Sequence, residues 1–243
     1  MRILVGVILI TLSATAWAAD DDEKLFVYGT YLNCDVSGED AADATFEKYM
    51  APAYEATLKS GDIVGWGYMK HVAGGKWRRL TYHMGPSVTA VIKAGKKQGD
   101  MVDEKLKPRD NNFGKACHSH DDYIWENKAG NTIEQRGKVG LSVYLVCNIG
   151  NESRADELVD EVFAPIYDKQ LEAGTLTSWG WFSHIVGGKY RRLLAITAED
   201  FDQLFAARDE LLGSIGGTSA GREFSSICGS HQDYLWDIVA EGR

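Results

Sequence analysis

Residues 65–80 decide the fold: they read GWGYMKHVAGGKWRRL, and 113 positions later residues 178–193 read SWGWFSHIVGGKYRRL. Nine of the 16 aligned positions are identical, and most of the others exchange similar residues. In each copy, two runs of aromatic and apolar residues flank a Gly-Gly pair. A two-residue glycine turn between such runs is typical of a β-hairpin. The sequence therefore predicts the same hairpin twice.

The internal match extends well beyond the hairpin. The offset of 113 also pairs Cys34 with Cys147. Near the ends of the two halves, CHSHDDYIW at 117–125 matches CGSHQDYLW at 228–236 with an offset of 111. A self-similar chain of this kind folds as repeated units. We therefore predict a first repeat at 25–125, a linker at 126–140 and a second repeat at 141–238.

Each half is predicted to run strand, helix, hairpin, helix, strand. Apolar residues at helical spacing, and β-branched or aromatic runs between turn residues, indicate these elements. We expect proline to break the first helix of each half, at Pro52 and Pro165. Gly95 and Gly99 are expected to interrupt the second helix of the first half. The last strand of the second half is predicted within residues 224–238.

A βαββαβ order is the split-βαβ arrangement of ferredoxin-like folds. Two such units in tandem, together with the step Phe163-Ala164-Pro165-Ile166 in the first helix, resemble the dimeric α/β-barrel superfamily. The resemblance covers nearly the whole chain after residue 19. It implies an α+β fold in which two antiparallel sheets pack as an intramolecular two-sheet barrel. It also implies a monomer with an internal pseudo-twofold axis.

The composition excludes several classes of protein. The 243 residues are 44% apolar and 25% charged and include four prolines, which argues against a disordered, collagen-like or coiled-coil chain. A formal net charge of −9 argues against nucleic acid as the main partner. After Ala19 no stretch approaches the roughly 18 uninterrupted apolar residues of a transmembrane segment.

The first 19 residues have the pattern of a signal peptide. Arg2 is followed by an apolar stretch at 3–16, and Ala16 and Ala18 supply small residues for cleavage. We therefore expect residues 1–19 to be removed and the protein to be secreted or periplasmic.

Four cysteines in an exported chain favour disulfides. In a ferredoxin-like sheet the first and fourth strands are antiparallel neighbours, which favours Cys34–Cys117 and Cys147–Cys228 over the other two connectivities. The alternative is a metal site built on Cys117-x-x-His120 and Cys228-x-x-His231. Residues three apart on a strand point to opposite faces, so such a site needs a bulge. We predict disulfides and no metal.

The hairpin carries the first group of candidate site residues. Pairing across the glycine turn sets His71 opposite Arg78, and His184 opposite Arg191. An adjacent arginine favours a neutral imidazole, which can act as a base, while the arginine can hold an anionic oxygen. The alternative is a solvated hairpin tip with no ligand. Candidate ligand-binding residues on the alternate face are Trp66, Tyr68, Arg79, Trp179, Trp181 and Arg192.

The second group of candidates is a His-x-Asp pair in each half. His120 and Asp122, and likewise His231 and Asp233, share one face of a strand, so the carboxylate can orient the imidazole for acid–base work. The alternative is that these polar residues protect a sheet edge. If the two sheets close as in the superfamily, each His–Arg pair is expected to approach the His–Asp pair of the other half, forming two pseudo-equivalent clefts.

These residues leave several functions open. The leading prediction is an exported protein that binds a small aromatic or anionic organic molecule in a barrel or cleft. The superfamily resemblance implies cofactor-independent oxygenase, isomerase or lyase chemistry, with His71 or His184 as base and Arg78 or Arg191 as anion holder. A non-catalytic envelope or matrix interaction protein is the alternative, and a haem-binding protein with a histidine ligand is the third option. We predict no cofactor and leave open whether the protein is an enzyme.

Overall fold

The computed structural model describes residues 24–132 and 136–243, so the predicted signal peptide at 1–19 lies outside the described residues. The first repeat contains β1 (Phe26–Cys34), α1 (Glu39–Thr45), α2 (Ala51–Lys59), β2 (Gly65–Gly74), β3 (Arg79–Gly85), α3 (Val88–Lys105), α4 (Asn112–Ala116) and β4 (Cys117–Gly130). The second repeat contains β5 (Val139–Val146), α5 (Glu152–Leu158), α6 (Ala164–Glu172), β6 (Ser178–Val186), β7 (Arg192–Ala198), α7 (Phe201–Ile215), α8 (Ser219–Ile227) and β8 (Ser230–Gly242).

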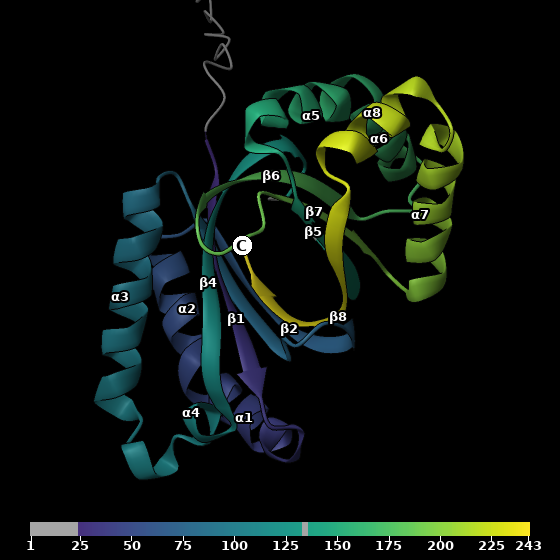
Figure 1. Cartoon of the computed structure of the whole chain (residues 1–243). Helices are drawn as coiled ribbons and strands as arrows, with labels where there is room; N and C mark the ends of the chain where they lie inside the picture. The colour runs from purple at the N-terminus through teal and green to yellow at the C-terminus, as the bar shows by residue number, and fades with distance from the viewer. Residues whose placement is uncertain (1–23, 133–135) are drawn as a thin grey trace, which may run out of the picture.

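The strands form one closed antiparallel barrel in the order β1-β3-β2-β8-β5-β7-β6-β4 (Figure 1). Each repeat contributes four neighbouring strands. The two four-stranded sheets are joined where β2 pairs with β8 and β4 pairs with β6. Helices α1–α4 lie outside the first half of the wall and α5–α8 outside the second half (Figure 1). The predicted α+β class, the ferredoxin-like repeats and the two-sheet barrel are confirmed.

Three apolar cores stabilise this arrangement. The barrel interior is filled by aromatic side chains from both repeats, among them Tyr31, Trp125, Tyr144 and Trp236. The residual cavity inside the barrel is only about 40 Å³. The other two cores lie between the outer face of each half-sheet and its helices. A separate, more polar hollow of about 560 Å³ lies where Trp77, Tyr123, Tyr190 and Tyr234 of this core meet the hairpin turns. The mainly apolar cavities lie outside the barrel wall, between each half-sheet and its helices.

Both predicted disulfides are present. Cys34 is bonded to Cys117 and Cys147 to Cys228, across sequence separations of 83 and 81 residues. In the first repeat, Cys34 and Cys117 are direct partners in the pairing of β1 with β4. Closing a loop of this length stabilises the folded chain by about 4–5 kcal/mol in the chain-entropy model. All four sulfur atoms are used, so the alternative metal site based on these cysteines is wrong.

The two helix-breaking predictions had different outcomes. Pro52 and Pro165 each follow a π-helical segment, Phe46–Met50 or Val159–Phe163, which interrupts regular α-helical hydrogen bonding. In contrast, α3 runs through Gly95 and Gly99 without a break, so the predicted interruption was wrong. Ser87 caps α3 by accepting a hydrogen bond from the Ala90 amide. The buried face of α3 packs on the sheet. These contacts offset the roughly 1 kcal/mol that each glycine costs a helix.

The last strand of the second repeat also differs from its predicted range. Residues 224–227 belong to α8, and β8 begins only at Ser230, because Thr218 caps this helix and Phe224 packs into the second-repeat core. At the other end, β4 continues to Gly130 and β8 to Gly242, since their final residues pair with the opposite repeat. Within the described ranges no helix is both long and apolar enough to span a membrane.

Candidate functional site

The predicted pair at the first hairpin is in direct contact. Arg78 Nη1 lies 2.6 Å from His71 Nδ1, and Arg78 Nε donates to Glu39 Oε1 at 2.6 Å. A guanidinium has no acceptor, so His71 Nδ1 accepts and the imidazole proton sits on Nε2. His71 Nε2 is buried without a hydrogen-bond partner among the described residues. Burial, and then the charge of Arg78, lowers the pKa of His71 and keeps its ring neutral.

The second hairpin repeats this arrangement. Arg191 Nη1 lies 2.8 Å from His184 Nδ1, and Arg191 Nε donates to Glu152 Oε1 at 2.7 Å. Burial, and then the charge of Arg191, lowers the pKa of His184. The His184 ring meets Trp125 edge to face, with 6.0 Å between ring centroids. Both histidines therefore pack against the aromatic interior. In each ring Nδ1 is bonded to an arginine and Nε2 is buried.

The next residue in each hairpin, Arg79 or Arg192, joins the hairpin to a helix. In the first repeat Arg79 Nε donates to Asp43 Oδ1 at 2.7 Å, and Lys70 pairs with the same carboxylate at 2.8 Å. Burial by itself raises the pKa of Asp43, but hydrogen bonds from Arg79, Lys70 and Tyr68 outweigh it, and the pKa is lowered. The aspartate is therefore ionised and fully engaged.

All six residues predicted to bind ligand lie under the helices with polar partners. The indole of Trp66 donates to Glu55 at 3.0 Å, and that of Trp179 donates to Asp168 at 2.9 Å. The remaining four are bound to two aspartates: Tyr68 and Arg79 to Asp43, and Trp181 and Arg192 to Asp156. Their polar atoms tie the sheet to α1, α2, α5 and α6, while their ring faces pack in the cores.

Sequence reasoning missed the four carboxylates of these braces. They are Glu39 and Asp43 in the first repeat, and Glu152 and Asp156 in the second. The sequence does carry a signal for these carboxylates. Glu39 and Glu152, and likewise Asp43 and Asp156, are separated by the same 113 positions as the two hairpins. The carboxylates recur in both repeats, on the helix that precedes the hairpin with its Arg-Arg pair. This recurrence predicts an ion pair between the helix and the hairpin.

The two His-x-Asp pairs lie on the outer face of the wall. His120 Nε2 is 3.3 Å from Asp122 Oδ2, and His231 Nε2 is 3.6 Å from Asp233 Oδ1. Each pair lines a cavity between its half-sheet and the covering helices, with volumes of about 590 Å³ in the first repeat and 310 Å³ in the second. Two pseudo-equivalent cavities therefore exist, one within each repeat, with a His–Asp pair in each.

The expected meeting of the His–Arg and His–Asp groups does not occur in this structure. His71 pairs with Trp236 across the β2–β8 junction, and its ring packs beside Tyr234 and Trp236, which point into the barrel. Asp233 precedes Tyr234 on the same strand, so its side chain points to the outer face. The barrel wall separates the two groups. The clefts contain only the His–Asp halves of the predicted sites.

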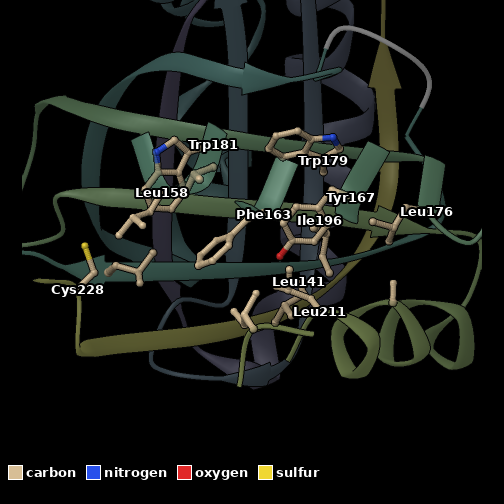
Figure 2. Packing of buried hydrophobic residues seen from close by; sticks show 14 of the residues in the cluster. Leu141, Leu158, Phe163, Tyr167, Leu176, Trp179, Trp181, Ile196, Leu211 and Cys228 are labelled. Atoms are coloured by element: carbon tan, nitrogen blue, oxygen red, sulfur yellow. The ribbon is translucent and has the colours of Figure 1, made fainter. Parts of the chain in front are cut away.

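The second-repeat cavity is mainly apolar. Figure 2 shows the cluster that surrounds it, in which Phe163 and Tyr167 from the helical side face Trp181, Leu141 and Ile196 from the sheet. Val143, Leu194, Leu211 and Leu212 add further apolar wall. The polar side chains that line it are Arg208, Ser225, His231 and Asp233. A mostly apolar cavity of roughly 300–1,000 Å³ with a few polar groups is the usual form of a small-molecule site.

One polar atom at the wall of this cavity lacks a hydrogen bond. Asp233 Oδ1 is buried and accepts none from the described residues, with His231 Nε2 beyond hydrogen-bonding distance. In the first repeat the equivalent atom of Asp122 accepts from Thr30 Oγ1 at 2.8 Å. Val143 occupies the position of Thr30 in the second repeat and cannot donate. A ligand with a donor group can satisfy this oxygen.

Neither cavity has the donor set that haem requires. Haem iron takes an axial side chain such as histidine. Two of the three lining histidines have a partner at Nε2: His83 the Val91 carbonyl and His120 the Asp122 carboxylate, while His231 Nε2 lies 3.6 Å from the Asp233 carboxylate. The His231 side chain is also 51% exposed. No group of three or more potential metal ligands occurs within 24–132 and 136–243. The residues present do not fit haem.

Comparison with known proteins supports the fold. No family model and no curated protein sequence matches this chain. A monooxygenase-like protein from Lactobacillus acidophilus aligns with a TM-score of 0.60 at 8% identity, over 91% of this chain and 96% of its own. An anthrone oxidase-like protein gives 0.55 at 12%, over 91% and 94%. A mutant chlorite dismutase from Candidatus Nitrospira defluvii gives 0.54 at 8%, over 89% and 92%.

Identities this low show a shared fold. The matches cover both repeats, and the barrel order joins the repeats through two equivalent strand pairs. In fold, the chain is therefore a tandem ferredoxin-like α/β barrel, similar to these proteins.

Proposed function

We propose that this protein binds a small, mostly apolar aromatic molecule in the second-repeat cavity, with one hydrogen-bond donor of the ligand placed on Asp233. The observation that carries the proposal is Asp233 Oδ1, which is buried without a hydrogen bond in the wall of a mainly apolar cavity of about 310 Å³. An unsatisfied buried acceptor costs about 1–3 kcal/mol. A ligand hydroxyl that donates to Asp233 recovers this energy, while its ring replaces water against the apolar wall.

The same geometry gives the site a means of proton transfer. His231 Nε2 lies 3.6 Å from Asp233 Oδ1, so a ligand hydroxyl bound at this oxygen also lies beside the imidazole, which can act as its base. Arg208, which also lines the cavity, is the cation available to a ligand that becomes anionic. Oxygenase, isomerase or lyase chemistry without a cofactor would then rest on His231. The names of the monooxygenase-like and anthrone oxidase-like neighbours agree with this direction.

The predicted bases at the hairpins are less suited to this role. In His71 and His184, Nδ1 is held by an arginine and Nε2 is buried against aromatic rings. Neither ring lines either sheet–helix cavity. We therefore assign the base function to the His–Asp pair and a stabilising function to the hairpin histidines.

A non-catalytic envelope or matrix protein is the competing function. A scaffold of that kind is expected to have a filled interior, and the barrel interior is indeed filled apart from about 40 Å³. The sheet–helix cavity of the second repeat is not filled, and this favours a binder. The two disulfides support a secreted or periplasmic location, because such bonds persist in oxidising compartments.

Calorimetric titration with 2-naphthol tests the proposal, since this probe has an aromatic body and a single hydroxyl donor. We expect binding at one site. Val143→Phe fills the cavity and should weaken binding at least tenfold. Val239→Phe, at an exposed position on β8, is the matched control and should bind like the unmodified protein. Equal binding by Val143→Phe and the unmodified protein would overturn the proposal.

A further inference from the structure

The two sheet–helix cavities occupy equivalent places, but their linings differ. Tyr28 on β1 pairs with His83 on β3 in the first repeat, and at the same register Leu141 on β5 pairs with Ile196 on β7. Both cavities keep the His–Asp pair on the fourth strand. Five further lining positions are polar in the first repeat and apolar in the second: Tyr28/Leu141, Thr30/Val143, Thr81/Leu194, His83/Ile196 and Gln98/Leu211.

The fold does not require polar side chains at these positions. Thr81, His83 and Gln98 are only 6%, 3% and 5% exposed. Burial of polar groups costs free energy that hydrogen bonds must offset. The second repeat forms the same elements with leucine and isoleucine there. The polar lining of the first repeat therefore indicates recognition of a polar ligand.

The first-repeat cavity is also larger. Arg208 and Leu212 of α7 line the second cavity, and their equivalents on α3 are Gly95 and Gly99. A Cβ added at Gly99 would meet no atom within 4 Å. The absence of two long side chains is one reason why this cavity has about 590 Å³ where its counterpart has 310 Å³.

We propose that the first-repeat cavity is a second binding site, specific for a neutral, planar aromatic molecule that carries at least two hydroxyl groups. Its ligand thus differs in polarity from the ligand of the second repeat. The site does not depend on the function proposed for the other cavity.

Flat rings provide the recognition of a planar ligand. The rings of Tyr28 and His83 are stacked, with 5.4 Å between centroids and 7° between planes. Tyr54 lies beside His83, with 6.0 Å between ring centroids and a tilt of 52° between ring planes. All three side chains line the cavity. An aromatic ligand can extend the stacked pair by stacking, as aromatic pairs do in protein interiors.

The polar lining provides the recognition of hydroxyl groups. Asp122 Oδ1 accepts from Thr30 Oγ1 at 2.8 Å, and Asp122 Oδ2 lies 3.3 Å from His120 Nε2. A carboxylate has about four acceptor positions, so Asp122 retains capacity for a ligand hydroxyl. Gln98 uses its amide nitrogen on Thr57 at 2.9 Å, which leaves its carbonyl oxygen as a further acceptor.

The charges around the cavity favour a neutral ligand. Among the described residues that line the cavity, Lys96 is the one lysine or arginine, and it forms an ion pair with Asp100 at 2.7 Å. Asp122 and Asp103 supply negative charge on opposite walls. An anion would meet two carboxylates without a free cation to offset them, so a carboxylic or sulfonic acid is disfavoured.

Titration with 2,3-dihydroxynaphthalene tests this proposal through variants that copy the second repeat. Gly99→Leu gives the first cavity the leucine side chain that Leu212 places in the second cavity, and it should weaken binding of the diol at least tenfold. Gly213→Leu is the matched control: its Cβ also meets no atom within 4 Å, and it does not line either cavity. It should gain the same helix stability and bind the diol normally. Val143→Phe should leave diol binding unchanged.

A second measurement tests the polarity of the ligand and does not depend on filling the cavity. Gln98→Leu removes one hydrogen-bond acceptor. It should weaken binding of the diol at least fivefold and change the affinity for 2-naphthol less than twofold. Far-ultraviolet circular dichroism checks that each variant is folded. Unchanged diol affinity in Gly99→Leu, or loss of diol binding in Val143→Phe alone, would overturn the proposal, because the diol would then occupy the other repeat or neither.

Discussion

The ring of Tyr123, on β4, covers Gly187 at the tip of the hairpin of the other repeat. Gly187 has a φ of +142°, and a Cβ built on it would collide with Cδ1 of Tyr123. In the first hairpin the hydroxyl of Tyr234 covers Gly75, as that of Tyr123 covers Gly188, and a Cβ on Gly74 would collide with the backbone of Asp233 and Tyr234. Each repeat therefore holds the glycine turn of the other, which explains why both turns contain glycine and why the two halves close into one barrel.

This contact predicts a large effect of a single methyl group. Gly187→Ala should lower the free energy of unfolding by about 2 kcal/mol, because alanine is strained at this φ and meets the tyrosine ring. Urea unfolding followed by tryptophan fluorescence measures the change. Gly213→Ala, in α7 with no atom near its Cβ, is the control and should raise stability by up to about 1 kcal/mol. Similar effects of both substitutions would be inconsistent with the contact.

The hairpin histidines predict a dependence of stability on pH. The pKa values of His71 and His184 are lowered in the folded chain, so below about pH 6.5 the unfolded chain binds more protons. The free energy of unfolding should therefore fall as pH drops from 7.5 to 5.

The double variant His71→Gln/His184→Gln isolates this contribution. Glutamine still offers an acceptor to Arg78 and Arg191 but does not titrate. Its stability should vary less with pH over the same range, the remaining histidine part belonging to His83, whose pKa burial also lowers. An identical pH profile in the double variant and the unmodified protein would refute the assignment.

The buried ion pairs predict which charges the fold depends on. Asp43→Asn removes the carboxylate that pairs with Arg79 and Lys70, leaves Glu39 as the remaining anionic partner of Arg79, and should lower the free energy of unfolding by up to about 3–5 kcal/mol. Lys96→Ala removes the exposed pair with Asp100 and should cost no more than about 0.5 kcal/mol. Urea unfolding of both variants checks the contrast, and equal losses would contradict it.

Exchange of one residue pair between the repeats tests the unpaired oxygen of Asp233. Val143→Thr supplies the hydroxyl that Thr30 gives Asp122, and should raise the free energy of unfolding by about 0.5–1.5 kcal/mol. Thr30→Val should lower it by about 1–3 kcal/mol. Val143→Thr should also weaken binding of 2-naphthol, because the ligand then competes for a satisfied acceptor. A loss of stability in Val143→Thr would argue against the assignment.

The duplication made much of the fold predictable. Element order, the matching disulfides and the contact of His71 with Arg78 follow from strand pairing, which sequence periodicity and turn residues report. The closure of the barrel depends on the β2–β8 and β4–β6 junctions, which are contacts between the repeats. No local pattern specifies these junctions, and they were expected only from the superfamily resemblance.

The site was only partly predictable, for a physical reason. The register of β2 shifts between His71 and Ala73, so simple alternation could not tell which group the histidine would face. The cavities depend on side-chain volume at α3 and α7, where Gly99 and Leu212 differ although their helices align. Empty space is a property of packing in three dimensions, and a linear pattern does not record it.

Native mass spectrometry of the protein purified from its original host tests the central proposal most directly, with Val143→Phe purified in parallel. The account predicts that gently ionised wild-type protein carries a small organic molecule that dissociates on activation. It also predicts that Val143→Phe, with the second-repeat cavity filled, retains at most a small fraction of it. Equal occupancy in both proteins, or wild-type protein with the mass of the disulfide-bonded polypeptide alone, would contradict a ligand in this cavity.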